Sequence, residues 1–236
     1  MRQDIRIGLV VPHATDRLPA EAAIMYPGVK FIPRGVGVKA LTPEGYDSAW
    51  EGIVPAAKEL AGQGVDAVMA LGTSLTFYRG YAAHTRLVEQ LRDVTGLPVS
   101  TMSAAVLEGL RSLGARRIGV CTAYADEVNE RLRAFLVASG FEVLALEGFG
   151  LERFNAPSEK SEEDIIALAG RVCAEARRAE GLLISCGGLR TLAVGKTIED
   201  TYGVPVVSST PAALWTAVRL VGESGRVPGY GRLLDA

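Results

Sequence analysis

The chain has 236 residues, of which 48% are apolar and 22% are charged, and its formal net charge is −2. This balance is typical of a globular protein and excludes a disordered chain. It also excludes a basic surface that would attract nucleic acid or an anionic membrane, so we expect a small molecule as the partner. No apolar run reaches the roughly 18 residues of a membrane-spanning helix, and the N-terminus lacks a signal-peptide pattern.

Three widely spaced cysteines, Cys121, Cys173 and Cys186, form neither a CxxC metal pair nor a disulfide framework. No spacing of histidine and carboxylate residues predicts a metal site, and no glycine-rich phosphate loop follows a strand. We therefore expect a cytoplasmic chain with free thiols, no metal and no cofactor. The oligomeric state stays open between a monomer and a small homo-oligomer.

Short β-branched runs alternate with longer segments of helical period, which predicts βαβ units and parallel sheets. Strands are predicted at residues 5–11, 67–71, 99–102, 118–122, 143–146, 182–185 and 206–208. Helices are predicted at residues 46–62, 79–95, 104–114, 125–139, 162–179 and 212–221. Asp126 and Ser161 stand where a side chain can cap a helix start, and Gly62, Gly114 and Gly140 stand where a left-handed residue can end one.

An internal repeat underlies this pattern. Three segments recur in the same order, at separations of 111, 114 and 107 positions: 7–10 with 118–121, 66–75 with 180–189, and 96–99 with 203–206. The repeat predicts an α/β fold of two similar Rossmann-like lobes with parallel sheets, related by a pseudo-twofold axis, with the active site in the cleft between them. We assign residues 1–115 and 210–236 to the N-terminal lobe and residues 116–209 to the C-terminal lobe.

Ligands of such folds lie beyond the carboxyl ends of the parallel strands. Cys186 follows a predicted strand and precedes two glycines, whose backbone can approach a ligand closely and present amide donors. A thiol in this position is suited to proton transfer or nucleophilic attack. The alternative is a small buried hydrophobic residue, which we expect for Cys121 and Cys173.

The repeat also places Gly72 opposite Cys186. An enzyme that exchanges a proton on both faces of a carbon needs an acid and a base that face each other, and here one of the two positions has no side chain. A lone thiol can still protonate one face of a carbanion. The asymmetry therefore favours a reaction that forms its carbanion another way, such as by loss of carbon dioxide.

Hydroxyl groups surround the same point. Thr73, Ser74 and Tyr124, with the amides that follow Gly72 and Cys186, would hold a carboxylate and stabilise its enediolate form. The alternative role for Thr73 and Ser74 is to cap the following helix, and the two roles are compatible.

Pro12 and His13 form the turn after the first predicted strand, so we expect both at the cleft. His13 is either a base or a structural residue at the rim. His84 falls in a predicted helix, where we expect a solvated face.

These residues carry a resemblance to a known family. The chain resembles the arylmalonate decarboxylases of the aspartate/glutamate racemase superfamily, which also includes the maleate isomerases. The matching stretches run in order through nearly the whole chain: residues 42–47, 72–75, 77–80, 101–103, 122–124, 128–132, 185–189, 204–209 and 228–233.

The resemblance implies a cofactor-free decarboxylation of a disubstituted malonate, such as an arylmalonate, to a chiral 2-substituted acid, through an enediolate that Cys186 protonates. It implies that one carboxylate of this small dicarboxylate substrate lies in a dioxyanion hole formed by Thr73, Ser74, Tyr124 and the backbone of Cys186 and Gly187. The other carboxylate would lie in an apolar pocket whose family-matched positions include Val38, Leu41 and Tyr46. Loss of carbon dioxide would relieve the penalty of placing its charge there.

Two departures from the family bear on the substrate. His13 stands where the family has a second proline, and residues 154–157 differ from the corresponding apolar stretch. Both predict a change in substrate size or polarity more than in reaction type. Two other functions stay open: a racemase or cis–trans isomerase in which another residue, such as His13, replaces the missing cysteine, and a non-catalytic carboxylate-binding protein that closes on its ligand.

Overall fold

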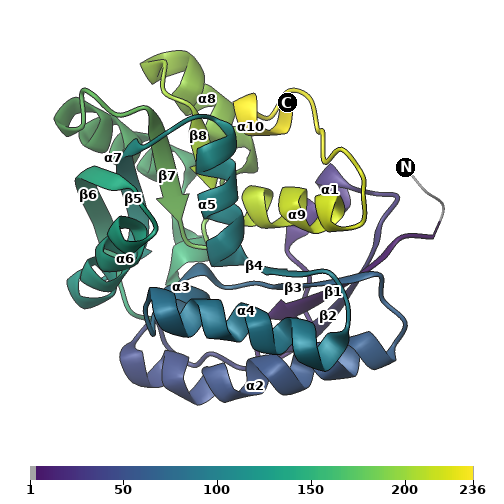
Figure 1. The fold of residues 1–236 in the computed structure, drawn as a ribbon. Coiled ribbons are helices and arrows are strands. Elements are labelled where there is room, and N and C mark those ends of the chain that lie inside the picture. Colours follow the sequence, from purple (N-terminus) through teal and green to yellow (C-terminus); the bar gives the residue numbers. More distant parts are fainter. Residues whose placement is uncertain (1–3, 236) are drawn as a thin grey trace.

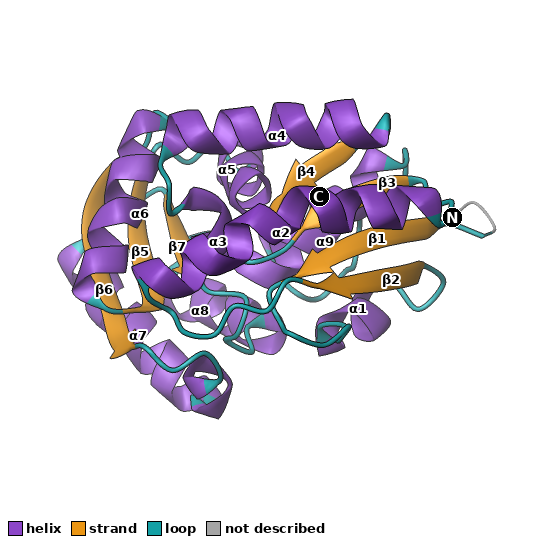
Figure 2. Ribbon diagram, turned by 90° about the horizontal axis from the view of Figure 1, so that it is seen from below, coloured by secondary structure: helices purple, strands orange, loops and turns teal. Residues whose placement is uncertain are grey.

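The computed structural model describes residues 4–235 and contains two parallel sheets, each covered by helices (Figures 1 and 2). The first sheet has the order β2-β1-β3-β4 and is formed by β1 (Arg6–Val11), β2 (Lys30–Gly35), β3 (Ala67–Ala70) and β4 (Val99–Thr101). The second has the equivalent order β6-β5-β7-β8 and is formed by β5 (Arg117–Tyr124), β6 (Glu142–Leu151), β7 (Gly181–Ser185) and β8 (Val206–Ser208). This arrangement confirms the prediction of two similar α/β lobes.

The helices follow the strands in the order that βαβ units require. In the first half they are α1 (Ala20–Met25), α2 (Pro43–Gly62), α3 (Thr73–Phe77), α4 (Tyr81–Thr95) and α5 (Met102–Ser112). In the second half they are α6 (Asp126–Ala138), the 3-10 helix η1 (Ala156–Glu159), α7 (Glu162–Glu175), α8 (Leu192–Tyr202), α9 (Ser209–Leu220) and α10 (Arg232–Asp235).

Local chemistry fixes several helix boundaries. The Ser161 side chain accepts a hydrogen bond from the Asp164 amide, and Asp164 accepts one from the Ser161 amide, which forms the capping box that begins α7. Asp126 is the first residue of α6 and caps nothing, because Ala125 holds the capping position. Gly114 and Gly140 have the predicted left-handed backbone, but α2 ends through Gly64 rather than Gly62.

Some elements escape the sequence pattern. Strand β2 contains Pro33, which is unfavourable inside a sheet, but β2 is an edge strand and pairs only with β1. Helices α1, α3, α8 and α10 and the 3-10 helix were not predicted. Gly80, with a φ of 83°, separates α3 from α4 where the sequence suggests one helix from residue 79.

Helices α5 and α9 lie between the two lobes (Figure 1). They pack against each other, and each contacts strands of both sheets: α5 contacts β4, β7 and β8, and α9 contacts β3, β4, β7 and β8. Because α9 contacts strands of both sheets, these contacts do not assign the C-terminal segment to either lobe. The lobe boundaries themselves stay a prediction.

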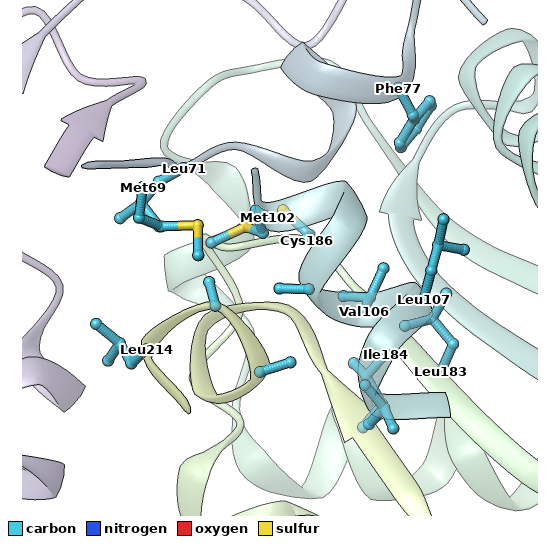
Figure 3. Packing of buried hydrophobic residues seen from close by; sticks show 14 of the residues in the cluster. Met69, Leu71, Phe77, Met102, Val106, Leu107, Leu183, Ile184, Cys186 and Leu214 are labelled. Carbon is cyan, nitrogen blue, oxygen red and sulfur yellow. The ribbon is translucent and has the colours of Figure 1, made fainter. Parts of the chain in front are cut away.

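Buried apolar side chains of both lobes form one continuous cluster. Figure 3 shows part of it, with Met69, Met102 and Cys186 together where the lobes meet. Cys121 is fully buried, as predicted, whereas Cys173 is partly exposed. Among the described residues, no helix is long and apolar enough to cross a membrane.

The prediction for His84 is wrong. Its side chain is only 5% exposed, and its Nε2 lies 2.7 Å from Thr101 Oγ1. Burial lowers the pKa of His84 to about 4, so the ring is neutral at neutral pH. The sequence pattern misses this because the ring packs edge-on against Phe135 of the other lobe, 5.3 Å between centroids.

Candidate active site

A cavity of about 550 Å³ opens beyond the carboxyl ends of β1, β3 and β7. It brings together residues that are distant in the sequence and that come from both lobes. The predicted site residues that line it are Pro12, His13, Val38, Leu41, Tyr46, Gly72, Thr73, Ser74, Cys186 and Gly187. Tyr124 does not line the cavity, because its side chain is fully buried behind the wall.

Cys186 is the residue directly after β7, and its side chain is 7% exposed. Burial raises the pKa of the thiol to about 11. The amides of Gly188 and Leu189 and the Tyr124 hydroxyl act in the opposite direction, because they stabilise the thiolate. The Gly188 amide donates to the Cys186 sulfur over 3.4 Å. The group is therefore a thiol at neutral pH, and it has donors in place to receive the charge when it gives up its proton.

Gly72 occupies the equivalent position after β3 and lines the same cavity as Cys186, as the repeat predicts. Its φ of 95° is one that other residues adopt only with strain. A Cβ at this position would lie 3.1 Å from the Leu75 Cβ and 3.6 Å from the Pro12 Cβ. The space at Gly72 is therefore small, and any side chain placed there must displace Leu75.

Thr73 and Ser74 begin α3, but neither caps it through its side chain, so the capping interpretation is wrong. The Thr73 hydroxyl donates to Ser209 Oγ over 2.7 Å. The Ser103 hydroxyl donates to the Thr73 carbonyl over 2.9 Å and fixes the backbone of this turn. The Thr73 side chain is thus free of the helix and is oriented by Ser209 at the start of α9.

The backbone donors differ in availability. The Cys186 amide donates to Ser209 Oγ over 3.2 Å, so it is not free for a ligand, in contrast to the prediction. The Gly187 amide has no hydrogen-bond partner within residues 4–235, while the Gly187 carbonyl accepts from the Thr210 hydroxyl over 3.3 Å. Gly187 therefore has a free backbone donor and lines the cavity.

Tyr46 differs from the purely apolar lining that we expected. Its side chain is 2% exposed, and its hydroxyl has no hydrogen-bond partner among the described residues. The Ser74 hydroxyl is close enough to favour the tyrosinate, but the geometry between the two groups is not that of a formed hydrogen bond. Burial dominates and raises the pKa of Tyr46 far above its usual value. A neutral donor without a partner thus borders an otherwise apolar wall.

His13 lies at the rim, half-buried, with its ring packed edge-on against Phe154 of the other lobe at 5.1 Å between centroids. Burial, and to a lesser extent the charge of Arg17, lower the pKa of His13. The ring is therefore neutral at neutral pH, and its contact with Phe154 joins the two lobes across the mouth of the cavity.

Sequence reasoning missed Ser209 and Met102. Ser209 contacts both Thr73 and Cys186, and a Cβ at Gly187 would lie 3.3 Å from the Met102 sulfur. The repeat contains the signal for both, because Met102 and Ser209 are separated by the same 107 positions as the segments 96–99 and 203–206. No group of three or more histidine, cysteine or carboxylate side chains in residues 4–235 is arranged to hold a metal ion.

Comparison with known proteins identifies the family. The model of a family described as arylmalonate decarboxylase matches residues 7–234. The chain is 45% identical over 230 residues to an arylmalonate decarboxylase of Bordetella bronchiseptica, covering 97% of this chain and 96% of the relative. The chain belongs to the arylmalonate decarboxylase family. It is also 27% identical over 246 residues to a maleate isomerase of Nocardia farcinica, covering 97% of this chain and 95% of that one.

Solved structures agree with this membership in the arylmalonate decarboxylase family. An arylmalonate decarboxylase variant with a glycine-to-cysteine and a cysteine-to-serine substitution, solved with a ligand, superimposes with a TM-score of 0.96 at 44% identity, covering 98% of this chain and 99% of that one. The two substituted positions of that variant are 114 residues apart, as are Gly72 and Cys186. The maleate isomerase of Pseudomonas putida S16 shares the fold, with a TM-score of 0.91 at 22% identity and coverage of 99% of each chain.

The state of the Cys186 thiol gives a first prediction. Because burial raises its pKa to about 11, the thiolate that reacts with iodoacetamide is scarce at neutral pH. We expect the rate of alkylation at Cys186, followed by peptide mass spectrometry, to rise through pH 8–10 without levelling off. A plateau reached below pH 8 would contradict a protonated resting thiol.

Proposed function

We propose that the protein removes carbon dioxide from a disubstituted malonate, such as an arylmalonate, and returns a proton to one face of the product, giving one enantiomer of a 2-substituted acid. The observation that carries this proposal is that the buried Cys186 thiol shares its cavity with Gly72, the equivalent position of the repeat, which has no side chain. Family membership supports the same reaction class.

In the proposed reaction the bond between the central carbon and one carboxylate breaks, and its electron pair moves into the remaining carboxylate to form an enediolate. The Cys186 thiol then gives its proton to the central carbon. The electron pair of the S–H bond stays on sulfur as a thiolate, which regains a proton from solvent. Each turnover consumes one proton and releases one carbon dioxide, so no redox partner is needed.

Hydrogen-bond donors in the cavity lining would stabilise the enediolate as its charge develops. Thr73, Ser74 and Gly187 line the cavity, and the Gly187 amide has no partner among the described residues. Tyr124, behind the wall, would act through its stabilising effect on the thiolate of Cys186. Preorganised donors of this kind typically lower the activation barrier more than any other single feature of an active site.

The departing carboxylate would face the apolar part of the cavity lining. Val38 and Leu41 are each 5% exposed and present only hydrocarbon. A carboxylate placed there loses most of its solvation, and this penalty disappears when neutral carbon dioxide forms. The unpartnered Tyr46 hydroxyl is the polar exception in this wall, and it can orient the carboxylate without neutralising its charge.

We also infer a cytoplasmic location. All three cysteines are free thiols, which is usual in a reducing compartment and unusual outside one.

A decarboxylation assay tests the proposal directly. We expect the protein to release carbon dioxide from one or more of phenylmalonate, methylphenylmalonate and simple alkylmalonates. Replacing the proton donor in Cys186→Ser should lower kcat by roughly 100- to 10,000-fold, the usual contribution of a general acid. Cys173→Ser is the matched control, because Cys173 lies in α7 and does not line the cavity.

The outcomes separate enzyme from binding protein. If neither the wild type nor any variant releases carbon dioxide, and Cys186→Ser binds malonates as well as the wild type, the protein is a carboxylate-binding protein. If Cys186→Ser keeps wild-type turnover, the thiol is not the acid.

A second cysteine should change the reaction. In Gly72→Cys, two thiols would face the central carbon, so a proton could be removed from one face and returned to the other. We expect this variant to racemise a chiral 2-arylpropionate, seen by proton NMR as exchange of the α-hydrogen in D2O, and to decarboxylate more slowly than the wild type. The left-handed backbone and the nearby Leu75 should lower the free energy of unfolding by about 1–3 kcal/mol.

Gly64→Ala is the stability control, because Gly64 also has a positive φ but open space around its missing Cβ. Unchanged activity in a folded Gly72→Cys protein would contradict the facing geometry. Rapid exchange by the wild-type protein would instead favour an isomerase or racemase in which His13 supplies the second group.

A further inference from the structure

Ser209 is the first residue of α9, and its hydroxyl joins the two strand-end turns that form the active site. It accepts from the Thr73 hydroxyl over 2.7 Å and from the Cys186 amide over 3.2 Å. It donates to the Ile184 carbonyl over 3.4 Å. The side chain is 1% exposed and does not line the cavity, so it reaches the site only through its neighbours.

These three bonds use the full capacity of one hydroxyl, which has one donor and two acceptor sites. The Cys186 amide can only donate and the Ile184 carbonyl can only accept, so the direction of both bonds is fixed. Because the hydroxyl hydrogen of Ser209 points to the Ile184 carbonyl, Thr73 must be the donor in the bond between Thr73 and Ser209. In this arrangement the hydroxyl hydrogen of Thr73 therefore points to Ser209, which does not line the cavity.

This orientation conflicts with the proposed task of Thr73. To stabilise a carboxylate or an enediolate, Thr73 must donate its hydrogen into the cavity. The bond of 2.7 Å between Thr73 and Ser209 is short, whereas the bond of 3.4 Å between Ser209 and the Ile184 carbonyl is long and weak. If Ser209 turns its hydrogen from Ile184 to Thr73, the short contact persists with its direction reversed.

We propose that Ser209 is a positioning residue whose hydroxyl rotates when a carboxylate binds, and so converts Thr73 from a donor toward the protein into a donor toward the substrate. The proposal rests on the proposed function. In the liganded state Ser209 donates to Thr73 and Thr73 donates to the carboxylate, while the Cys186 amide still donates to Ser209. Only the long bond to Ile184 is lost, and donors linked in a chain polarise each other.

The repeat gives this role a contrast within the same molecule. Ser103 donates to the Thr73 carbonyl over 2.9 Å, and its repeat partner Thr210 donates to the Gly187 carbonyl over 3.3 Å. The backbone of both turns is thus held in equivalent ways. One position earlier the lobes differ, because Met102 stands where the other half has Ser209. The hydroxyl is present only on the side that contacts Thr73 and the Cys186 amide, so holding the turns does not require it.

The test is a double-mutant cycle with Ser209→Ala and Thr73→Val. Because Ser209→Ala weakens the Thr73 donor rather than removing it, we expect kcat for phenylmalonate to fall about tenfold, less than the loss typical for a deleted oxyanion donor. KM should change less than kcat. In a Thr73→Val background the same Ser209→Ala change should have an effect of less than about twofold, because the hydroxyl through which it acts is gone.

Thr216→Val is the matched control, because Thr216 is a buried residue of the same helix whose hydroxyl contacts Glu108 outside the cavity. It should keep wild-type kcat. If Ser209→Ala does not fold, Ser209→Cys retains the side-chain volume with a poor donor and should show the same loss. Wild-type kcat in a folded Ser209 variant, or an equal loss with and without the Thr73 hydroxyl, would overturn the proposal.

The same cycle on the Kd of 2-phenylpropionate separates the two proposals. This monocarboxylate cannot lose carbon dioxide to give an enediolate, so its affinity reports the hydroxyl chain without turnover. Coupling between Ser209 and Thr73 in a protein that releases no carbon dioxide would support the role of Ser209 and reject the decarboxylase. Carbon dioxide release without coupling between Ser209 and Thr73, in either kcat or Kd, would support the decarboxylase and reject the role of Ser209.

Discussion

Burial of the Cys186 thiol is the constraint on which the rest of the site depends. A buried thiolate without compensation is costly, so the group stays protonated and can act as an acid. The site must also stabilise the thiolate that remains when the thiol gives up its proton. The amides of Gly188 and Leu189 and the Tyr124 hydroxyl stabilise that charge without supplying a cation that would deprotonate the thiol in advance. Glycine at position 188 lets its amide approach the sulfur, because a Cβ there would lie 3.0 Å from the Pro157 Cβ.

The cavity lining combines hydrogen-bond donors with hydrocarbon, and in the proposed reaction this combination would give two chemically identical carboxylates different fates. Thr73, Ser74 and Gly187 bring donors to the lining, while Val38 and Leu41 bring only hydrocarbon. A malonate that places one carboxylate against each kind of group would lose the less solvated one. The choice of bond to be broken would then follow from solvation, and the face that receives the proton would follow from the position of the thiol.

Much of the fold could be predicted from the sequence because parallel buried strands leave a clear pattern and the repeat supplied a second copy of three of them. The misses have physical causes. Strand β2 contains Pro33, which is acceptable because β2 is an edge strand. The periodicity of the sequence does not show which strand lies at an edge. His84 lies on a helix whose pattern suggests solvent, but the other lobe covers it. Burial by a distant segment cannot be seen in a local window.

The candidate site was predictable to the level of residue types at strand ends, and less so for their hydrogen bonds. Thr73 and Cys186 could be placed in one cleft from the repeat alone. That the Cys186 amide is occupied, that the Tyr46 hydroxyl is not, and that Tyr124 lies behind the wall depend on side-chain directions, which no sequence pattern encodes. The resemblance to a family assigned roles to these residues, and the structure shows which of their hydrogen-bond donors are free.

The position of α5 and α9 between the two lobes has a consequence for how such a protein can evolve. Each helix packs on strands of both halves, so each half would lose part of the cover of its sheet if it were made alone. A self-associating ancestor of half the length would meet this need as a symmetric pair, but both copies would then carry the same residue at every equivalent point. In a single chain that contains both halves, Gly72 can differ from Cys186, and Met102 from Ser209. The proposed delivery of a proton to one face would depend on that freedom.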